Sequence, residues 1–86
     1  MDFYNKKIKI FSYTLNYYKK DDREKLESMK KMFKKCGYTC YINVIRDDNN
    51  KLRTSFVIEC LGSNFSDVSD ILYFWGAEVY DYTELD

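Results

Sequence analysis

Two apolar runs joined by a polar loop constrain the fold of this chain more than any other feature. The first run begins at Tyr38, the second ends at Gly62, and the hydrophilic residues 46–51 lie between them. Both runs are rich in β-branched and aromatic residues, which is typical of strands. The pattern predicts an antiparallel β-hairpin. Because an isolated hairpin is only marginally stable, it also predicts further strands and a helical cover.

The length of the hairpin loop decides which side chains share a face. The more apolar alternate positions are Tyr38, Cys40, Ile42 and Val44 in the first run and Phe56, Ile58 and Cys60 in the second. They share a face only if the loop has an odd number of residues, such as three or five, or a bulge. The five-residue loop 47–51 gives the pairs Ile42–Phe56 and Cys40–Ile58. A two-residue turn at 49–50 is locally favoured, but it would pair Cys40 with Glu59. We therefore expect the five-residue loop.

The N-terminal part of the chain predicts a strand followed by a helix. Residues 6–15 form the strand, whose two faces carry Ile8 and Ile10 on one side and Lys7, Lys9, Phe11 and Tyr13 on the other. Apolar residues then recur at helical spacing: Leu26, Met29, Phe33 and Cys36. Asp21 or Asp22 is the expected N-cap of this helix, and Gly37 the residue that ends it.

The C-terminal part predicts a second helix and a last strand. Ser63 or Ser66 is the expected N-cap, and the apolar stripe of the helix comprises Phe65, Val68, Ile71, Leu72 and Trp75. Gly76 ends this helix. Residues 77–82 return as a short strand, and we expect 83–86 to be a frayed tail.

This order of elements indicates a fold class. Strand, helix, strand, strand, helix, strand predicts a ferredoxin-like βαββαβ fold of the α+β class, with a four-stranded antiparallel sheet and two helices on one face. Right-handed crossovers place the first and third strands in the centre. The chain length of 86 residues predicts a single domain, 1–86. Since many unrelated functions share this fold, it does not indicate a function.

Composition predicts the compartment. No apolar run is long enough to span a membrane, and the charged N-terminus does not have the pattern of a signal peptide. Three cysteines in a domain of otherwise ordinary composition are typical of a reducing compartment. We therefore expect a soluble, cytoplasmic protein without membrane contact.

Several catalytic chemistries lack their usual residues. The chain has no His, so the commonest general base and transition-metal ligand are missing. It also has no glycine-rich phosphate loop, because its three glycines fall at expected element ends. We therefore expect no catalytic residues and no cofactor, that is, a protein that is not an enzyme.

Metal binding is also disfavoured. Cys36, Cys40 and Cys60 could form a three-thiolate site, but a closed zinc site usually has four ligands, and all three cysteines fall on expected core positions. Pairs of carboxylates such as Asp21–Asp22 and Asp47–Asp48 lie in expected turns or first helical turns. We read them as solvated acids, and we expect no metal site.

The charges are segregated along the chain although they sum to zero. Residues 1–37 contain eleven Lys or Arg against five Asp or Glu, residues 38–62 contain three of each, and residues 63–86 contain six acids and no base. One interpretation is that the two ends pack side by side and neutralise each other. The other is that one end binds an oppositely charged partner.

The acidic C-terminal segment supplies the first binding hypothesis. Its acids are interleaved with tyrosines, and the candidate partner-binding residues, here called the acidic set, are Asp67, Asp70, Tyr73, Glu78, Tyr80, Asp81, Tyr82 and Glu84. Carboxylates presented in this way could occupy phosphate sites on a basic, nucleic-acid-binding protein. The alternative is a solvated helix face and an edge strand whose charges prevent aggregation.

Small size, the lack of His, nine tyrosines and the segregated charges are similar in general character to those of phage or mobile-element inhibitors of host nucleases, including anti-CRISPR proteins. The resemblance implies binding to a basic protein through the acidic set, with Tyr80 and Tyr82 as anchors.

Two other classes remain open. The sheet face away from the helices would carry aromatic and basic residues, here called the open-face set: Lys9, Phe11, Tyr13, Tyr41 and Arg53. These residues could stack single-stranded nucleic acid. The same face could instead form a structural homodimer. We favour a protein partner over nucleic acid because the chain has no net basic charge.

Overall fold

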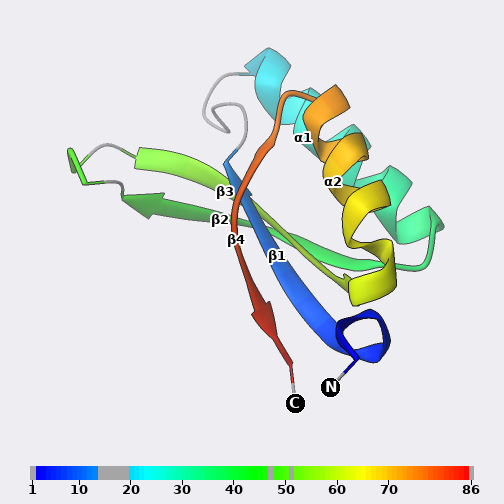
Figure 1. The fold of residues 1–86 in the computed structure, drawn as a ribbon. Helices are drawn as coiled ribbons and strands as arrows, with labels where there is room; N and C mark the ends of the chain where they lie inside the picture. Colours follow the sequence, from blue (N-terminus) through cyan, green and yellow to red (C-terminus); the bar gives the residue numbers. More distant parts are fainter. Residues whose placement is uncertain (1, 14–19, 47, 51, 86) are drawn as a thin grey trace.

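The computed structural model of the chain describes residues 2–13, 20–46, 48–50 and 52–85 (Figure 1). In chain order the elements are η1 (Phe3–Asn5), β1 (Lys7–Tyr13), α1 (Lys20–Lys35), β2 (Thr39–Arg46), β3 (Leu52–Leu61), η2 (Gly62–Asn64), α2 (Phe65–Phe74) and β4 (Glu78–Glu84), where η denotes a 3-10 turn.

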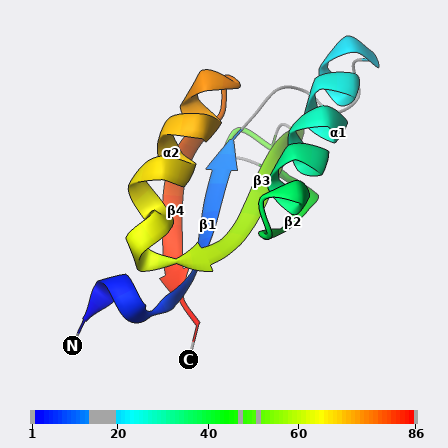
Figure 2. The same ribbon diagram turned by 90° about the vertical axis from the view of Figure 1, so that its right-hand side faces the viewer.

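Four strands in the described part of the chain form one sheet. Their order is β2-β3-β1-β4, and every neighbouring pair is antiparallel. Strands β1 and β3 are therefore central, as expected, and β2 and β4 form the edges. Both helices cover the same face, with α2 on the side of β4 and α1 on the side of β2 (Figure 2). The expected α+β class, with an antiparallel four-stranded sheet and two helices, is confirmed.

The register of the β2–β3 hairpin is the predicted one. Ile42 pairs with Phe56 and Cys40 pairs with Ile58, and the last pair before the loop is Arg46 with Leu52. At the tip, Asn50 adopts a positive φ of 61°, and its carbonyl accepts a hydrogen bond of 2.9 Å from Nη1 of Arg46. The two ends of the predicted loop, Asp47 and Lys51, lie outside the described residues.

The core lies between the sheet and the two helices. Its fully buried members are Ile8, Ile10, Phe56 and Ile58 from the sheet, Leu26, Met29 and Phe33 from α1, and Val68 and Leu72 from α2. The predicted apolar stripe of the first helix is correct except at Cys36, which is exposed. Cys36 follows the last residue of α1, immediately before the turn at Gly37.

Both helices end in the same motif. After α1, the Tyr38 amide donates to the Phe33 carbonyl and the Gly37 amide to the Lys34 carbonyl, which is a Schellman motif. After α2, the amides of Ala77 and Gly76 bond in the same way to Leu72 and Tyr73. Gly37 and Gly76 have φ values of +90° and +83°, which explains why glycine ends each helix.

The expected N-caps are wrong. Asp21 and Asp22 lie inside the first turn of α1, which begins at Lys20. There their charges still interact favourably with the helix dipole, which is why the sequence pattern resembles a cap. Helix α2 begins at Phe65, after the turn η2, and its cap residue Asn64 makes no side-chain cap bond. The backbone of η2 replaces the expected serine, since the Phe65 amide donates to the Gly62 carbonyl.

The last strand is longer than expected and irregular. Thr83 and Glu84, which the sequence suggested were frayed, pair with β1, and the Leu85 amide donates to the Lys7 carbonyl. The register shifts within the strand: Asp81 lies opposite Phe11 but Val79 lies opposite Ser12, so Tyr80 is an extra residue in a β-bulge. Asp86 lies outside the described residues.

Candidate functional site

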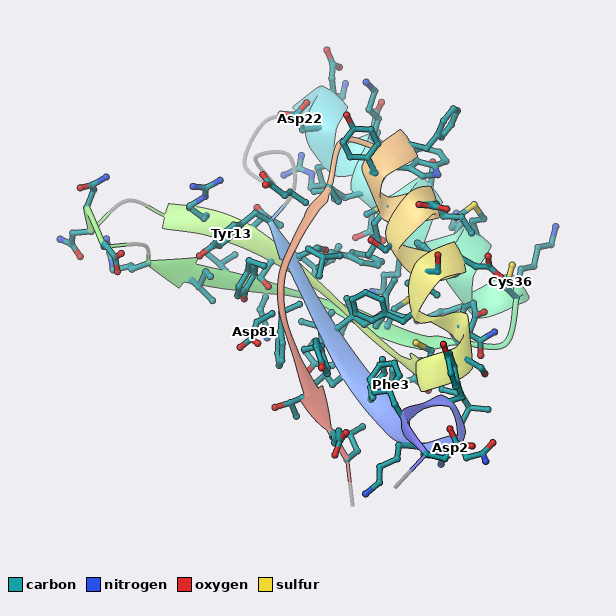
Figure 3. All side chains as sticks on the ribbon, viewed as in Figure 1. Asp2, Phe3, Tyr13, Asp22, Cys36 and Asp81 are labelled. Carbon is teal, nitrogen blue, oxygen red and sulfur yellow. The ribbon has the colours of Figure 1, made fainter. Side chains whose placement is uncertain are left out.

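The open-face set comes together as expected. All five residues lie on the face of the sheet away from the helices, and Figure 3 shows Tyr13 and Asp81 on the side of the sheet away from α1 and α2. Cations cover two of the aromatic rings. The Arg53 guanidinium carbon lies 4.2 Å from the centre of the Tyr13 ring, and Lys9 Nζ lies 5.8 Å from the centre of the Tyr41 ring. Both distances are within the range of cation–π attraction.

Tyr80 joins this face although sequence reasoning assigned it only to the acidic set. Its ring stacks on that of Tyr13 with centroids 4.1 Å apart and an interplanar angle of 18°. Its hydroxyl lies 3.2 Å from Oγ of Ser55, within hydrogen-bond distance. The bulge in β4 makes this possible, because it turns Tyr80 toward the open face while Val79 packs against the core. No signal in the sequence reveals such a bulge.

The aromatic cluster formed by Phe11, Tyr13 and Tyr80 acts as a cover for the open face. Beneath it, Val57 and Ser55 of β3 have relative exposures of 0% and 1%, although neither α1 nor α2 covers this side. Arg53 approaches the Tyr13 ring from β3 and Tyr80 approaches it from β4, so both faces of that ring are occupied. The open face is therefore a second small core.

The acidic set is distributed over two neighbouring elements. Asp67 and Asp70 are exposed on α2, and Glu78, Asp81 and Glu84 are exposed on β4. Glu84 pairs with Lys6 at 3.9 Å, so the two ends of the chain do meet at this point. The other four acids form no ion pair with any residue that the structure describes. One oxygen of Asp81 accepts a hydrogen bond of 2.8 Å from the Tyr82 amide.

The three tyrosines of the acidic set have different surroundings. Tyr80 packs on the open face, and Tyr82 makes edge contacts with Phe3 and Phe65 at 5.6 and 5.5 Å between ring centres. Both are nevertheless more than two-fifths exposed. Tyr73 is 81% exposed, so it is the tyrosine of the set that is most available to a partner.

An open groove separates the end of α2 from the start of β4. Its volume is about 720 Å³, and it is lined by Ser69, Tyr73, Gly76, Ala77, Glu78 and Val79. The groove brings together two members of the acidic set, Tyr73 and Glu78. Beside Tyr73, Phe74 is 84% exposed. Sequence reasoning missed Phe74, and the available signal was that it is a large apolar residue outside the predicted stripe of its helix.

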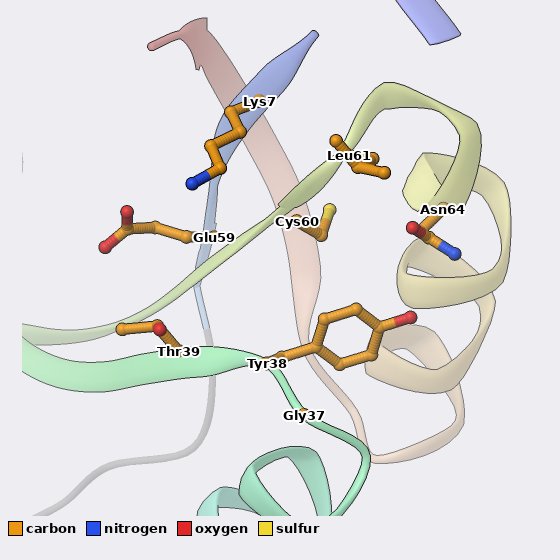
Figure 4. Close-up of a pocket in the computed structure, with 8 residues that line it drawn as sticks. All are labelled: Lys7, Gly37, Tyr38, Thr39, Glu59, Cys60, Leu61 and Asn64. Carbon is orange, nitrogen blue, oxygen red and sulfur yellow. The ribbon is translucent and has the colours of Figure 1, made fainter. Parts of the chain in front are cut away.

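A second cleft, of about 330 Å³, lies where β2 begins and β3 ends (Figure 4). It is lined by Lys7, Gly37, Tyr38, Thr39, Glu59, Cys60, Leu61 and Asn64. Burial raises the pKa of the Cys60 thiol to about 11. The pKa of Tyr38 is also raised, first by burial and then by the nearby Cys60. Both groups therefore remain protonated near neutral pH, and neither supplies a nucleophile there.

The cysteines are free thiols with different exposures. Cys36 is exposed, whereas Cys40 and Cys60 are buried. Burial raises the pKa of Cys40, although Lys34 and Lys30 act in the opposite direction, and its Sγ lies 3.5 Å from the Lys30 carbonyl. Within the described ranges, no group of three or more Cys, Asp or Glu residues is placed to hold a metal ion.

The helices of the described chain include none with the length and apolarity needed to cross a membrane. Comparison with known proteins gave no match, whether with protein-family models, with curated proteins or with solved structures.

Proposed function

We propose that this protein is a non-enzymatic binding module with a ferredoxin-like βαββαβ fold, and that it binds a basic protein through α2 and β4. The observation that carries the proposal is the set of exposed carboxylates without an ion-pair partner among the described residues: Asp67, Asp70, Glu78 and Asp81. Support for the fold comes from the strand order and from the position of both helices on one face.

The arrangement of the charges favours an external partner over internal neutralisation. The acids lie on α2 and β4. Most lysines of the basic N-terminal residues 1–37 lie instead on α1, the helix on the β2 side of the sheet (Figure 2). Acids that remain close to one another in water repel each other weakly. A partner that places Arg or Lys side chains among them removes this repulsion, and the field of the acidic side accelerates the encounter.

A protein partner suits the open face better than nucleic acid does. The nucleobases of a single strand stack on exposed aromatic rings, but the ring of Tyr13 already lies between Arg53 and Tyr80. Asp81, opposite Phe11 at the edge of this face, would also repel phosphates. A single-stranded nucleic-acid binder, for which the gathering of the open-face set is the supporting observation, is therefore the second candidate.

The functional class of the protein and its cellular compartment are also part of the proposal. A phage or mobile-element inhibitor of the anti-CRISPR type would use these carboxylates to occupy phosphate sites on a nucleic-acid-binding enzyme of its host. The three free thiols support a reducing compartment, and we propose the cytoplasm.

The test is affinity capture from a nuclease-treated native lysate with three forms of the tagged full-length protein. The first is the wild type. The second neutralises the acidic surface with Asp70→Asn, Glu78→Gln and Asp81→Asn. The third is a matched control that neutralises three exposed charges of α1 with Lys25→Gln, Lys31→Gln and Lys34→Gln. Mass spectrometry identifies the captured protein, and its affinity is then measured with purified material.

We expect one stoichiometric protein to be captured by the wild type and by the lysine variant, with an affinity about tenfold weaker for the acidic-surface variant. Equal affinity of both variants would contradict the proposal. Recovery of nucleic acid alone, in a lysate without nuclease, would support the open face as the binding site. Recovery of the bait alone at twice its monomer mass would support a homodimer.

A further inference from the structure

We propose that the groove between α2 and β4 receives an arginine side chain of the partner. This inference rests on the proposed function and specifies which chemical group the acidic surface recognises. Three independent features of the groove support arginine: its aromatic wall, its electrostatic potential and its apolar floor.

The aromatic wall is formed by Tyr73. This residue lies one helical turn after Ser69, so both line the same side of α2, and the Tyr73 ring is 81% exposed. Unlike Tyr13, it has no cation of the described chain over its ring. A planar guanidinium stacks on such a ring more favourably than a compact ammonium does. Tyr73 is thus a stacking surface that the described residues leave unused.

The electrostatic potential at this end of α2 is negative. A helix C-terminus carries a partial negative charge, which proteins usually offset with basic residues in the last turn. Helix α1 has Lys34 and Lys35 in that position, whereas α2 has no basic residue in its last turn. Glu78, which follows two residues after Gly76 and lines the groove, adds a full negative charge. The site therefore favours a cation.

The floor of the groove is apolar. Val79 packs against the core but stays partly exposed, so it presents hydrocarbon to the groove, and the nearly buried Ala77 lies behind it. The three methylene groups of an arginine can lie on this surface while the guanidinium stacks on Tyr73, and the charge of Glu78 at the start of β4 attracts it. A small inorganic cation would gain nothing from the floor or from the aromatic wall. Arginine is the natural side chain that matches all three features.

The inference is tested with a small probe instead of the unidentified partner. Amide signals of the full-length protein are followed by NMR while N-acetyl-arginine methylamide is added at constant ionic strength. The citrulline analogue, which has the same shape without the charge, is the matched probe. The protein variants are Tyr73→Leu, which removes the aromatic face but keeps apolar bulk, and Glu78→Gln. Glu24→Gln is the control, because it removes the same charge from an exposed residue of α1, outside the groove and the acidic set.

We expect the arginine probe to shift the amides of the residues that line the groove and the citrulline probe to leave them unchanged. Tyr73→Leu and Glu78→Gln should each weaken binding about two- to fivefold, whereas Glu24→Gln should bind like the wild type. Equal shifts with citrulline, shifts spread over the acidic surface, or an unchanged affinity in both groove variants would overturn the inference.

A second probe separates this inference from the proposed function. A short oligo-lysine peptide can bind exposed carboxylates without a guanidinium. If it binds the wild type and loses affinity for the acidic-surface variant while the arginine probe fails, the arginine groove is refuted and the proposed function stands. If neither probe binds, both fail.

Discussion

Single side chains decide which surfaces of this protein are available. Tyr13 lies on the open face, where it would be expected to stack with a ligand, but Arg53 and Tyr80 occupy its two sides. Tyr73 is also aromatic and close to acids, yet its ring remains exposed. From residue type alone, Tyr13 and Tyr73 would be equally good candidates for stacking with a ligand. Their neighbours make one of them part of the fold and leave the other exposed to solvent.

Burial of one thiol gives the stability of the fold a pH dependence. The pKa of Cys60 is about 11 in the folded chain and 9.0 ordinarily. Between these values the thiol ionises in the unfolded chain but stays protonated in the folded one, so the unfolded state is favoured as the pH rises. We expect the wild type to lose stability from about pH 9 towards pH 11 more steeply than Cys60→Ala. Urea unfolding at several pH values measures this difference.

The control for this experiment is Cys36→Ala, because Cys36 is exposed. Its pH dependence should match that of the wild type. Parallel curves for the wild type and Cys60→Ala would contradict the assignment of the effect to the buried thiol.

At the scale of elements, β4 has two structural roles separated by its bulge. Before the bulge, Val79 contributes to the main core, and at the bulge Tyr80 completes the cluster on the open face. One strand thus joins the two cores. Bulges are frequent at sheet edges, where they also hinder pairing with another chain.

Tyr80→Ala tests the contribution of this cluster. The substitution removes the ring stacked on Tyr13 and leaves the buried Ser55 hydroxyl without its tyrosine partner. We expect the free energy of unfolding to fall by about 1 to 2 kcal/mol, because the ring is partly exposed. The same change at exposed Tyr73 should alter it by less than about 0.5 kcal/mol. Urea denaturation compares the two variants, and equal losses would show that the cluster does not stabilise the fold.

The sequence predicted the parts of this fold that depend on regular periodicity. Parity of the apolar positions restricted the hairpin to an odd loop and so determined which residues share a face, since an even loop would set Cys40 opposite Glu59. The same parity identified the open-face set. The helix stripes and their terminal glycines followed from the 3.6-residue period and from the need for positive φ.

Irregular features were not predictable in the same way. The bulge at Tyr80 has no residue signature, and it exchanges the faces of the residues around it. The turn η2 satisfies the first amides of α2 through the backbone, so a serine was a misleading signal for the cap. The α2–β4 groove depends on how a helix and a strand diverge in space, and periodicity does not contain that information.

At the scale of the whole molecule, the open face is already closed by the protein's own side chains. Val57 and Ser55 are buried without a second subunit, so dimerisation is not needed to remove apolar surface from water on this side. We expect a monomer of 10.4 kDa in solution. Light scattering coupled to size-exclusion chromatography checks this mass. A value twice as large, persisting on dilution, would instead favour the structural homodimer.

The positions of the two terminal strands determine how the molecule responds to tension. β1 and β4 are antiparallel neighbours, and the start of one lies beside the end of the other, where Ile8 pairs with Glu84 (Figure 1). A pull on both ends of the chain therefore loads the bonds between these strands one after another, beginning at Leu85 and Lys7. The molecule would unzip at low force, and β4 would leave the sheet while the β2–β3 hairpin still bore no load.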